Sequence, residues 1–70
     1  MAKRPNIIPK APLARILLNA GAKRVSQESL DVFADVLQQR SEQIAIQAAK
    51  IAKHSGRKTV QEEDIKLAAK

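Results

Sequence analysis

The sequence predicts an all-α fold in which a short helix, a long central helix and a second short helix follow one another. Apolar residues recur at helical spacing in three stretches, and two glycines separate these stretches. The middle stretch runs for roughly 28 residues without Gly or Pro. At 1.5 Å per residue it forms a rod of about 42 Å, which two short neighbouring helices do not cover. We therefore expect the fold to be completed by a second chain.

Size and composition favour the same conclusion. A chain of 70 residues forms one domain at most, and it buries a small fraction of its surface. It has no cysteine for a disulfide or a thiolate site, and a single histidine excludes a histidine-rich metal centre. We predict no metal and no cofactor, and we expect association between chains to stabilise the domain.

The charge indicates the class of partner. Thirteen Lys and Arg residues against seven Asp and Glu residues give a net charge of +6, which attracts polyanions. Phe33 is the only aromatic residue, so the chain lacks the stacking platform of single-strand and RNA readers. Duplex DNA is the predicted partner, with no small-molecule substrate. No signal peptide or membrane span is expected, which is compatible with a cytoplasmic, chromosome-associated protein.

The N-terminal part divides into a tail and a short helix. Residues 1–10 form a basic, proline-interrupted tail that we expect to be flexible, with a DNA-contacting arm as the alternative. The folded domain is expected over residues 11–70. Pro12 suits the first turn of a helix, and Gly21 suits the position just beyond its C-terminus.

The rod is predicted to begin after Ser26, which is a good N-cap residue, and to end near His54. Arg40 and Ser41 interrupt its apolar stripe near the middle. A symmetric dimer in which two rods cross at their centres tolerates such residues. The stripe comprises Leu30, Phe33, Ala34, Leu37, Ile44, Ala45, Ala48, Ile51 and Ala52.

The C-terminal part begins with Gly56, which is expected to end the rod. Thr59 and Val60 favour a short extended step. The last helix is expected to start near Gln61 or Glu62, although Thr59 and Glu62 also fit a capping box with the N-cap at Thr59.

Three segments together resemble archaeal histones, and the resemblance covers nearly all of residues 9–70. They are A-P-L-A-R-I-L at 11–17, A-G-A-K-R-V-S at 20–26, and H-S-G-R-K-T-V at 54–60 followed by E-D-I-K-L-A at 63–68. The resemblance implies the histone fold and a handshake dimer with antiparallel rods. It further implies a homodimer or a heterodimer with a paralogue, and a tetramer or longer assembly on DNA.

The resemblance also implies roles for individual residues. In the handshake dimer, the loop at 23–26 of one chain lies beside the loop at 58–60 of the other. Arg15 matches an arginine that enters the minor groove. An exposed helix face is the alternative interpretation of Arg15, and a solvated face is the alternative for Lys53. The DNA-binding residues implied by the resemblance, together with Lys53, are Arg15, Arg24, Val25, Lys53, Lys58 and Thr59.

Further roles concern structure and assembly. Arg57 and Asp64 match a structural pair that braces the second loop, which we favour over a DNA contact for Arg57. His54 matches a contact between dimers, with a helix-end cation as its alternative. Gly21 matches a glycine that permits close stacking in extended assemblies. The implied dimer–dimer residues are Ile51, His54, Asp64 and Leu67.

We therefore predict a non-enzymatic protein that binds duplex DNA without sequence specificity and bends, wraps and compacts it into nucleosome-like chromatin. The main alternative is a histone-fold interaction subunit of a regulatory complex with weak DNA binding. A sequence-specific helix-turn-helix regulator and a membrane-active basic helix are weaker alternatives, because the long rod and the Pro and Gly punctuation argue against them.

Overall fold

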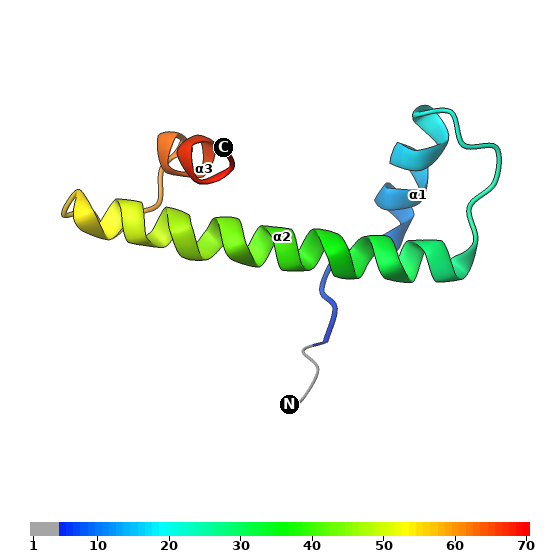
Figure 1. The fold of residues 1–70 in the computed structure, drawn as a ribbon, viewed down its shortest axis with the longest axis horizontal. Coiled ribbons are helices and arrows are strands. Elements are labelled where there is room, and N and C mark those ends of the chain that lie inside the picture. Colours follow the sequence, from blue (N-terminus) through cyan, green and yellow to red (C-terminus); the bar gives the residue numbers. More distant parts are fainter. Residues whose placement is uncertain (1–4) are drawn as a thin grey trace. The chain divides into compact units, whose positions relative to one another are not determined.

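The computed structural model describes residues 5–70 and contains three helices in that range (Figure 1). They are α1 (Lys10–Asn19), α2 (Gln27–His54) and α3 (Glu62–Ala68). No strand is assigned within residues 5–70, so the expected all-α class is confirmed. The extended step at residues 59–60 is part of a loop, because a strand needs a second segment to complete its ladder. Residues 1–4, which carry part of the predicted tail, lie outside the described residues.

Helix α1 begins at Lys10, with Pro9 as its N-cap residue. Pro12 lies within the first turn, as predicted. The first N–H groups of a helix have no acceptor inside it, so the missing N–H of Pro12 breaks no hydrogen bond there.

The two glycines end α1 and α2 in the same way. Gly21 has φ +117° and Gly56 has φ +72°, a region that favours residues without a Cβ. After α1, the backbone N–H of Ala22 donates to the Leu17 carbonyl at 3.0 Å. After α2, the N–H of Arg57 donates to the Ala52 carbonyl at the same distance. These bonds satisfy carbonyls that a helix end would otherwise leave free, and they confirm both predicted helix stops.

Ser26 acts as the N-cap of α2, as predicted. Its Oγ accepts a hydrogen bond from the backbone N–H of Ser29 at 3.1 Å, and its carbonyl accepts from the N–H of Leu30. From there α2 continues for 28 residues to His54. Glu28 lies in its first turn and Lys53 in its last, as the helix dipole favours.

The chain divides into two compact units, Met1–Gln39 and Arg40–Lys70. In the first unit α1 packs against the N-terminal half of α2, where Leu13 and Ala34 are buried (Figure 1). The segment before α1 is also attached to α2. Asn6 Nδ2 donates to Asp35 Oδ1 at 2.8 Å, and the Ile7 N–H donates to Gln38 Oε1 at 2.7 Å.

In the second unit α3 packs against the C-terminal half of α2 (Figure 1). Ala48 and Ala52 of α2 are its buried apolar residues, and Asp64 of α3 is buried with its side chain paired. Arg40 reaches the end of α3, where its Nη2 donates to the Ala69 carbonyl at 3.4 Å. Arg40 therefore interrupts the apolar stripe and satisfies a carbonyl that follows the last helix.

Each unit has a small core and leaves large apolar side chains in solvent. The buried apolar residues among those described are one leucine and three alanines. In contrast, the large apolar residues Ile16 and Leu67 are each 55% exposed to solvent. Fully burying a side chain of that size lowers the free energy by roughly 1.5–3 kcal/mol. This exposed apolar surface therefore favours association with another chain. None of the helices within residues 5–70 is sufficiently long and apolar to span a membrane. The exposed large apolar residues are Ile7, Ile16, Leu18, Val32, Val36, Ile46, Val60, Ile65 and Leu67.

Candidate nucleic-acid interface

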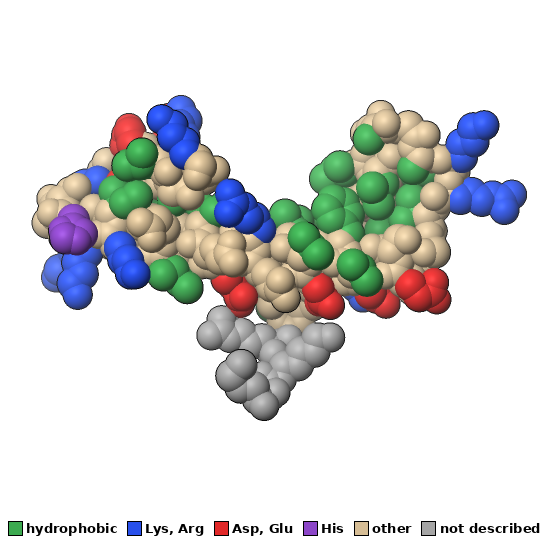
Figure 2. Space-filling view, in the orientation of Figure 1, with side chains coloured by type: hydrophobic (Ala, Val, Ile, Leu, Met, Phe, Trp, Pro, Cys, Tyr) green, Lys and Arg blue, Asp and Glu red, His purple; other side chains and the backbone are tan. Residues whose placement is uncertain are grey.

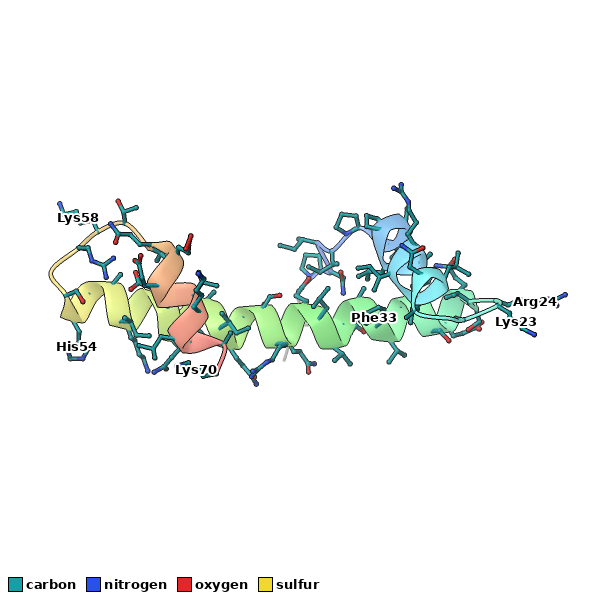
Figure 3. The ribbon with its side chains drawn as sticks, turned by 90° about the horizontal axis from the view of Figure 1, so that it is seen from above. Lys23, Arg24, Phe33, His54, Lys58 and Lys70 are labelled. Carbon is teal, nitrogen blue, oxygen red and sulfur yellow. The ribbon has the colours of Figure 1, made fainter. Side chains whose placement is uncertain are left out.

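The first candidate loop connects α1 to α2. Lys23 and Arg24 are exposed and project outward from it (Figure 3), whereas Val25 is half-buried. The loop is held between two defined helix ends, the stop at Gly21 and the Ser26 cap. It therefore presents two adjacent cations from a backbone with fixed ends, an arrangement that suits phosphate contacts.

The second candidate loop connects α2 to α3 and is braced from within. Arg57 Nη1 lies 2.8 Å from Asp64 Oδ2, and Arg57 Nη2 lies 2.9 Å from Asp64 Oδ1. Asp64 Oδ2 also accepts a hydrogen bond from the Gln61 backbone N–H at 2.9 Å, and Arg57 Nη1 donates to the Thr59 carbonyl at 3.3 Å. A bidentate pair of this kind fixes orientation as well as distance. The predicted pairing of Arg57 with Asp64 is thus present in the structure.

The electrostatics of this brace follow from its hydrogen bonds. The Arg57 guanidinium and the Gln61 N–H both stabilise the Asp64 carboxylate and lower its pKa from 3.8 to about 2. The same pairing raises the pKa of Arg57. Asp64 is 2% exposed, so its charge lies inside the fold with both oxygens engaged. The brace is therefore charged throughout the neutral pH range.

Lys58 and Thr59 lie on the loop that this brace holds. Both are exposed, and Lys58 points outward into solvent (Figure 3). Because Arg57 is occupied by Asp64 and by the Thr59 carbonyl, the adjacent Lys58 is the cation of this loop that is available to a ligand. The loop thus separates a structural cation from an exposed one.

Arg15 is placed on α1, away from either loop in the sequence. It is exposed, and Leu13 two residues earlier is buried against α2. Arg15 and Arg24 belong to the first compact unit, whereas Lys58 and Thr59 belong to the second. Each chain therefore carries the two predicted loop contacts in different units.

A third group of basic side chains lies at the end of α2. Lys50, Lys53 and His54 line an open hollow of about 540 Å³, and all three are exposed. Figure 2 shows Lys or Arg side chains gathered around the single histidine. His54 and Lys58 point in different directions (Figure 3), so the side chains of the hollow and of the second loop are presented separately.

The residues implied in contacts between dimers differ in accessibility. His54 and Leu67 are exposed and Ile51 is half-buried. Asp64, in contrast, is buried with its oxygens taken by Arg57 and Gln61. A Cβ atom at position 21 would meet nothing within 4 Å in the single chain. The positive φ of Gly21 is therefore the one feature of the single chain that favours glycine at this position. The assembly roles of these residues stay predictions.

Lys23 and Lys50 are exposed cations that the sequence pattern does not assign to DNA. Lys23 falls in the connection between two helices, although it adjoins Arg24 and projects outward beside it (Figure 3). Lys50 fits a solvated helix face. Lys50 lies three and four residues before Lys53 and His54, which places the three side chains on one side of a helix.

Comparison with known proteins shows which family the chain resembles. A model of the family described as histone-like transcription factor (CBF/NF-Y) and archaeal histone matches residues 6–69. An archaeal histone HAN1 subunit of Thermococcus zilligii is 40% identical over 63 residues, covering 90% of this chain and 94% of that protein. Probable archaeal histone 3 of Methanocaldococcus jannaschii is 46% identical over 61 residues, covering 87% of this chain and 91% of that protein.

Proposed function

The chain belongs to the family of histone-like transcription factors and archaeal histones, and on that premise we propose that it compacts duplex DNA. It binds the phosphate backbone without reading sequence, bends and wraps the duplex, and acts as a structural component of the chromosome. The observation that carries this proposal is the second loop, where the pairing of Arg57 with the buried Asp64 leaves the neighbouring Lys58 exposed.

The working unit in this proposal is a handshake dimer of two identical chains. Its support is the exposed apolar surface that each unit leaves, including Ile16 and Leu67, beside a buried core of one leucine and three alanines. Two antiparallel α2 helices cover that surface with a second copy of the same surface. Arg24 and Val25 of one chain then lie beside Lys58 and Thr59 of the other.

This pairing makes each loop half of a DNA site. In the handshake arrangement that the resemblance implies, a complete site takes one loop from each of two chains. A dimer contains two such sites, and the first helices with Arg15 contribute a third. Dimerisation is then a condition of DNA binding as well as of stability.

The proposed binding mode follows from backbone electrostatics. Each Lys or Arg that neutralises a phosphate releases condensed counterions, so affinity falls steeply as salt rises. Arg15 enters a minor groove that faces the protein, where a narrow groove concentrates negative potential. Histone octamers hold wrapped DNA in this manner without base-specific contacts. Duplexes that bend easily are therefore favoured, although no base is read.

The proposal is tested by competition and by the salt dependence of binding. Protein bound to a labelled duplex is challenged with unrelated duplexes of equal length, and we expect all of them to compete within a few-fold. Lys58→Gln removes two phosphate contacts per dimer and should lower the slope of log affinity against log salt by about 1.8.

Lys66→Gln is the matched control, because it removes the same charge from a side chain that pairs with Glu62 at 3.0 Å outside the loops. It should leave the slope unchanged. Strong preference for one duplex sequence would contradict packaging. Failure of the wild-type chain to bind any duplex would favour the alternative, a histone-fold subunit that pairs with a different protein.

A further inference from the structure

The middle of α2 carries a charged side chain within its apolar stripe. Helix α2 spans Gln27–His54, so its midpoint falls at Arg40 and Ser41. The stripe continues on both sides of this point, with Leu37 before it and Ile44 after it. In the proposed dimer the two rods cross at their centres, and a two-fold axis at the crossing brings the Arg40 residues of the two chains close to one another.

Arg40 is weakly held within its own chain. Its side chain is exposed, and its Nη2 donates to the Ala69 carbonyl at 3.4 Å, which is long for a hydrogen bond. Within residues 5–70 it forms no further hydrogen bond and no ion pair. A guanidinium has several N–H donors, so most of those of Arg40 are available to a group from a second chain.

An identical second chain offers Arg40 no carboxylate at the crossing. Glu42 is the nearest acidic residue in the sequence, but two residues turn a helix by about 200°, so Glu42 lies on the opposite side of α2. The other acids of α2 lie outside the apolar stripe, and those of α3 lie in its first turn, at the other end from Ala69. The other acids of α2 are Glu28, Asp31 and Asp35, and those of α3 are Glu62, Glu63 and Asp64.

Two identical chains therefore bring two positive charges to the centre of an otherwise apolar contact. A charge that is removed from water without a counter-charge destabilises the contact. A single polar residue within the apolar seam of paired helices has a known effect of this kind, because it specifies which pairing is accepted at a cost in stability. The identical pair is accommodated when each Arg40 turns toward the end of α3, as it does in the single chain. A chain with a carboxylate opposite Arg40 is favoured over that pair.

We propose that Arg40 selects the partner chain, and that the partner it fits best is a second histone-fold chain with an acidic side chain at the crossing. The inference rests on the proposed function, whose crossed dimer it retains, and it names a chain that pairs better than an identical one. The carboxylate pairs with the Arg40 guanidinium through charge-assisted hydrogen bonds. Arg24 and Lys58 lie in the loops beyond the two ends of α2, so the mixed dimer keeps this chain's contribution to both DNA sites.

The experiment uses a charge-reversed form of the protein as the complementary partner. Wild type and Arg40→Glu are unfolded together and refolded without DNA. One of them is labelled with heavy nitrogen, so that native mass spectrometry separates mixed from unmixed dimers. Random pairing makes half of the dimers mixed. An exposed ion pair at the strong end of its usual range favours the mixed dimer about fourfold, which corresponds to about four in five dimers.

Lys66→Glu is the matched control for this mixture. It lowers the net charge of +6 by the same two charges, but its side chain lies on α3 outside the apolar stripe of α2. General repulsion between basic chains is therefore the same in both mixtures. Wild type and Lys66→Glu should pair at random.

Arg40→Met provides a second and independent measurement. It removes the charge from the crossing and keeps an unbranched side chain there, so identical chains should pair more tightly. The urea midpoint at a fixed protein concentration should therefore rise above that of the wild type. The lost contact is one long hydrogen bond to the Ala69 carbonyl, which does not offset this gain.

Each contrary outcome has a distinct meaning. Random pairing of wild type with Arg40→Glu overturns the inference and leaves the proposed dimer intact, and so does a lower urea midpoint for Arg40→Met. If Arg40→Glu does not fold alone, the mixture still decides, because mixed dimers support the inference and their absence overturns it. A wild type that stays monomeric at every concentration removes both the dimer and the inference. Failure of the wild type to bind duplex DNA contradicts the proposed function alone, since this pairing is measured without DNA.

Discussion

Replacing Asp64 with asparagine should change how the stability of the protein responds to acid. Asp64 is the buried carboxylate that braces the α2–α3 loop, and it accepts two hydrogen bonds from Arg57 and one from the Gln61 N–H. The substitution Asp64→Asn retains one acceptor oxygen but turns an amide group toward the guanidinium. The variant therefore loses the ion pair at neutral pH and has no group left to titrate at this position.

The pH window follows from the direction of the shift. The folded-state pKa of Asp64 is about 2, below its ordinary value of 3.8. A group whose pKa is lowered by folding contributes stability that is fully present above its unfolded-state pKa. That contribution is lost as the pH falls through the folded-state value. The contribution of Asp64 should therefore be constant above about pH 5 and should decline between roughly pH 4 and 2.

The size of the effect can be counted in protons. Between pH 3.8 and about 2, the unfolded chain carries a proton on Asp64 that the folded chain does not. Unfolding of the wild type in that window therefore takes up close to one more proton per chain than unfolding of Asp64→Asn, or two per dimer. The other six acidic residues titrate in both proteins, so the difference isolates Asp64.

The assay is urea unfolding followed by circular dichroism at a fixed protein concentration from pH 2 to 7. We expect the free energy of unfolding of the wild type to exceed that of Asp64→Asn by a constant amount from about pH 5 to 7. The two curves should converge as the pH approaches 2. Parallel curves over the whole range would refute this reasoning, because the Asp64 carboxylate would then have the same pKa in both states.

Three further predictions concern stability. Leu13→Ala should lower the free energy of unfolding by about 2–5 kcal/mol per chain in urea titrations, because it empties the largest buried apolar position of the first unit; a change below about 1 kcal/mol would contradict its burial. Gly56→Ala should cost about 1–2 kcal/mol, since its φ of +72° is strained for a residue with a Cβ although the space around it is open; an unchanged midpoint would show that the turn relaxes. The thermal midpoint should rise with protein concentration, because folding and dimerisation are coupled; a midpoint constant over a hundredfold range would contradict the dimer.

The helix pattern is predictable from local chemistry. The uninterrupted periodicity from Ser26 to His54 predicts α2 within a residue, because the cap, the absence of Gly and Pro, and Gly56 all agree. Pro12 lies in the first turn of α1, as its missing N–H favours, whereas no local pattern indicates that Pro9 occupies the N-cap.

The site is predictable where its geometry is local. The Arg57–Asp64 pair spans seven residues around one turn, so sequence spacing and resemblance are sufficient to identify it. The attachment of Asn6 and Ile7 to α2 spans about thirty residues and depends on tertiary packing, so no local pattern indicates it. To predict the hollow at the end of α2, one must know that Lys50, Lys53 and His54 are all exposed. Helical periodicity alone does not give that information.

Nuclease digestion of the saturated protein–DNA complex tests the central claim, that this chain packages duplex DNA, most directly. We expect protected fragments from a mixed-sequence duplex, with lengths that increase by a constant step as further dimers add along the DNA. Lys58→Gln should shorten or abolish the protected series at the same salt, while Lys66→Gln should preserve it. Digestion of the duplex to completion at saturating wild-type protein would contradict the claim.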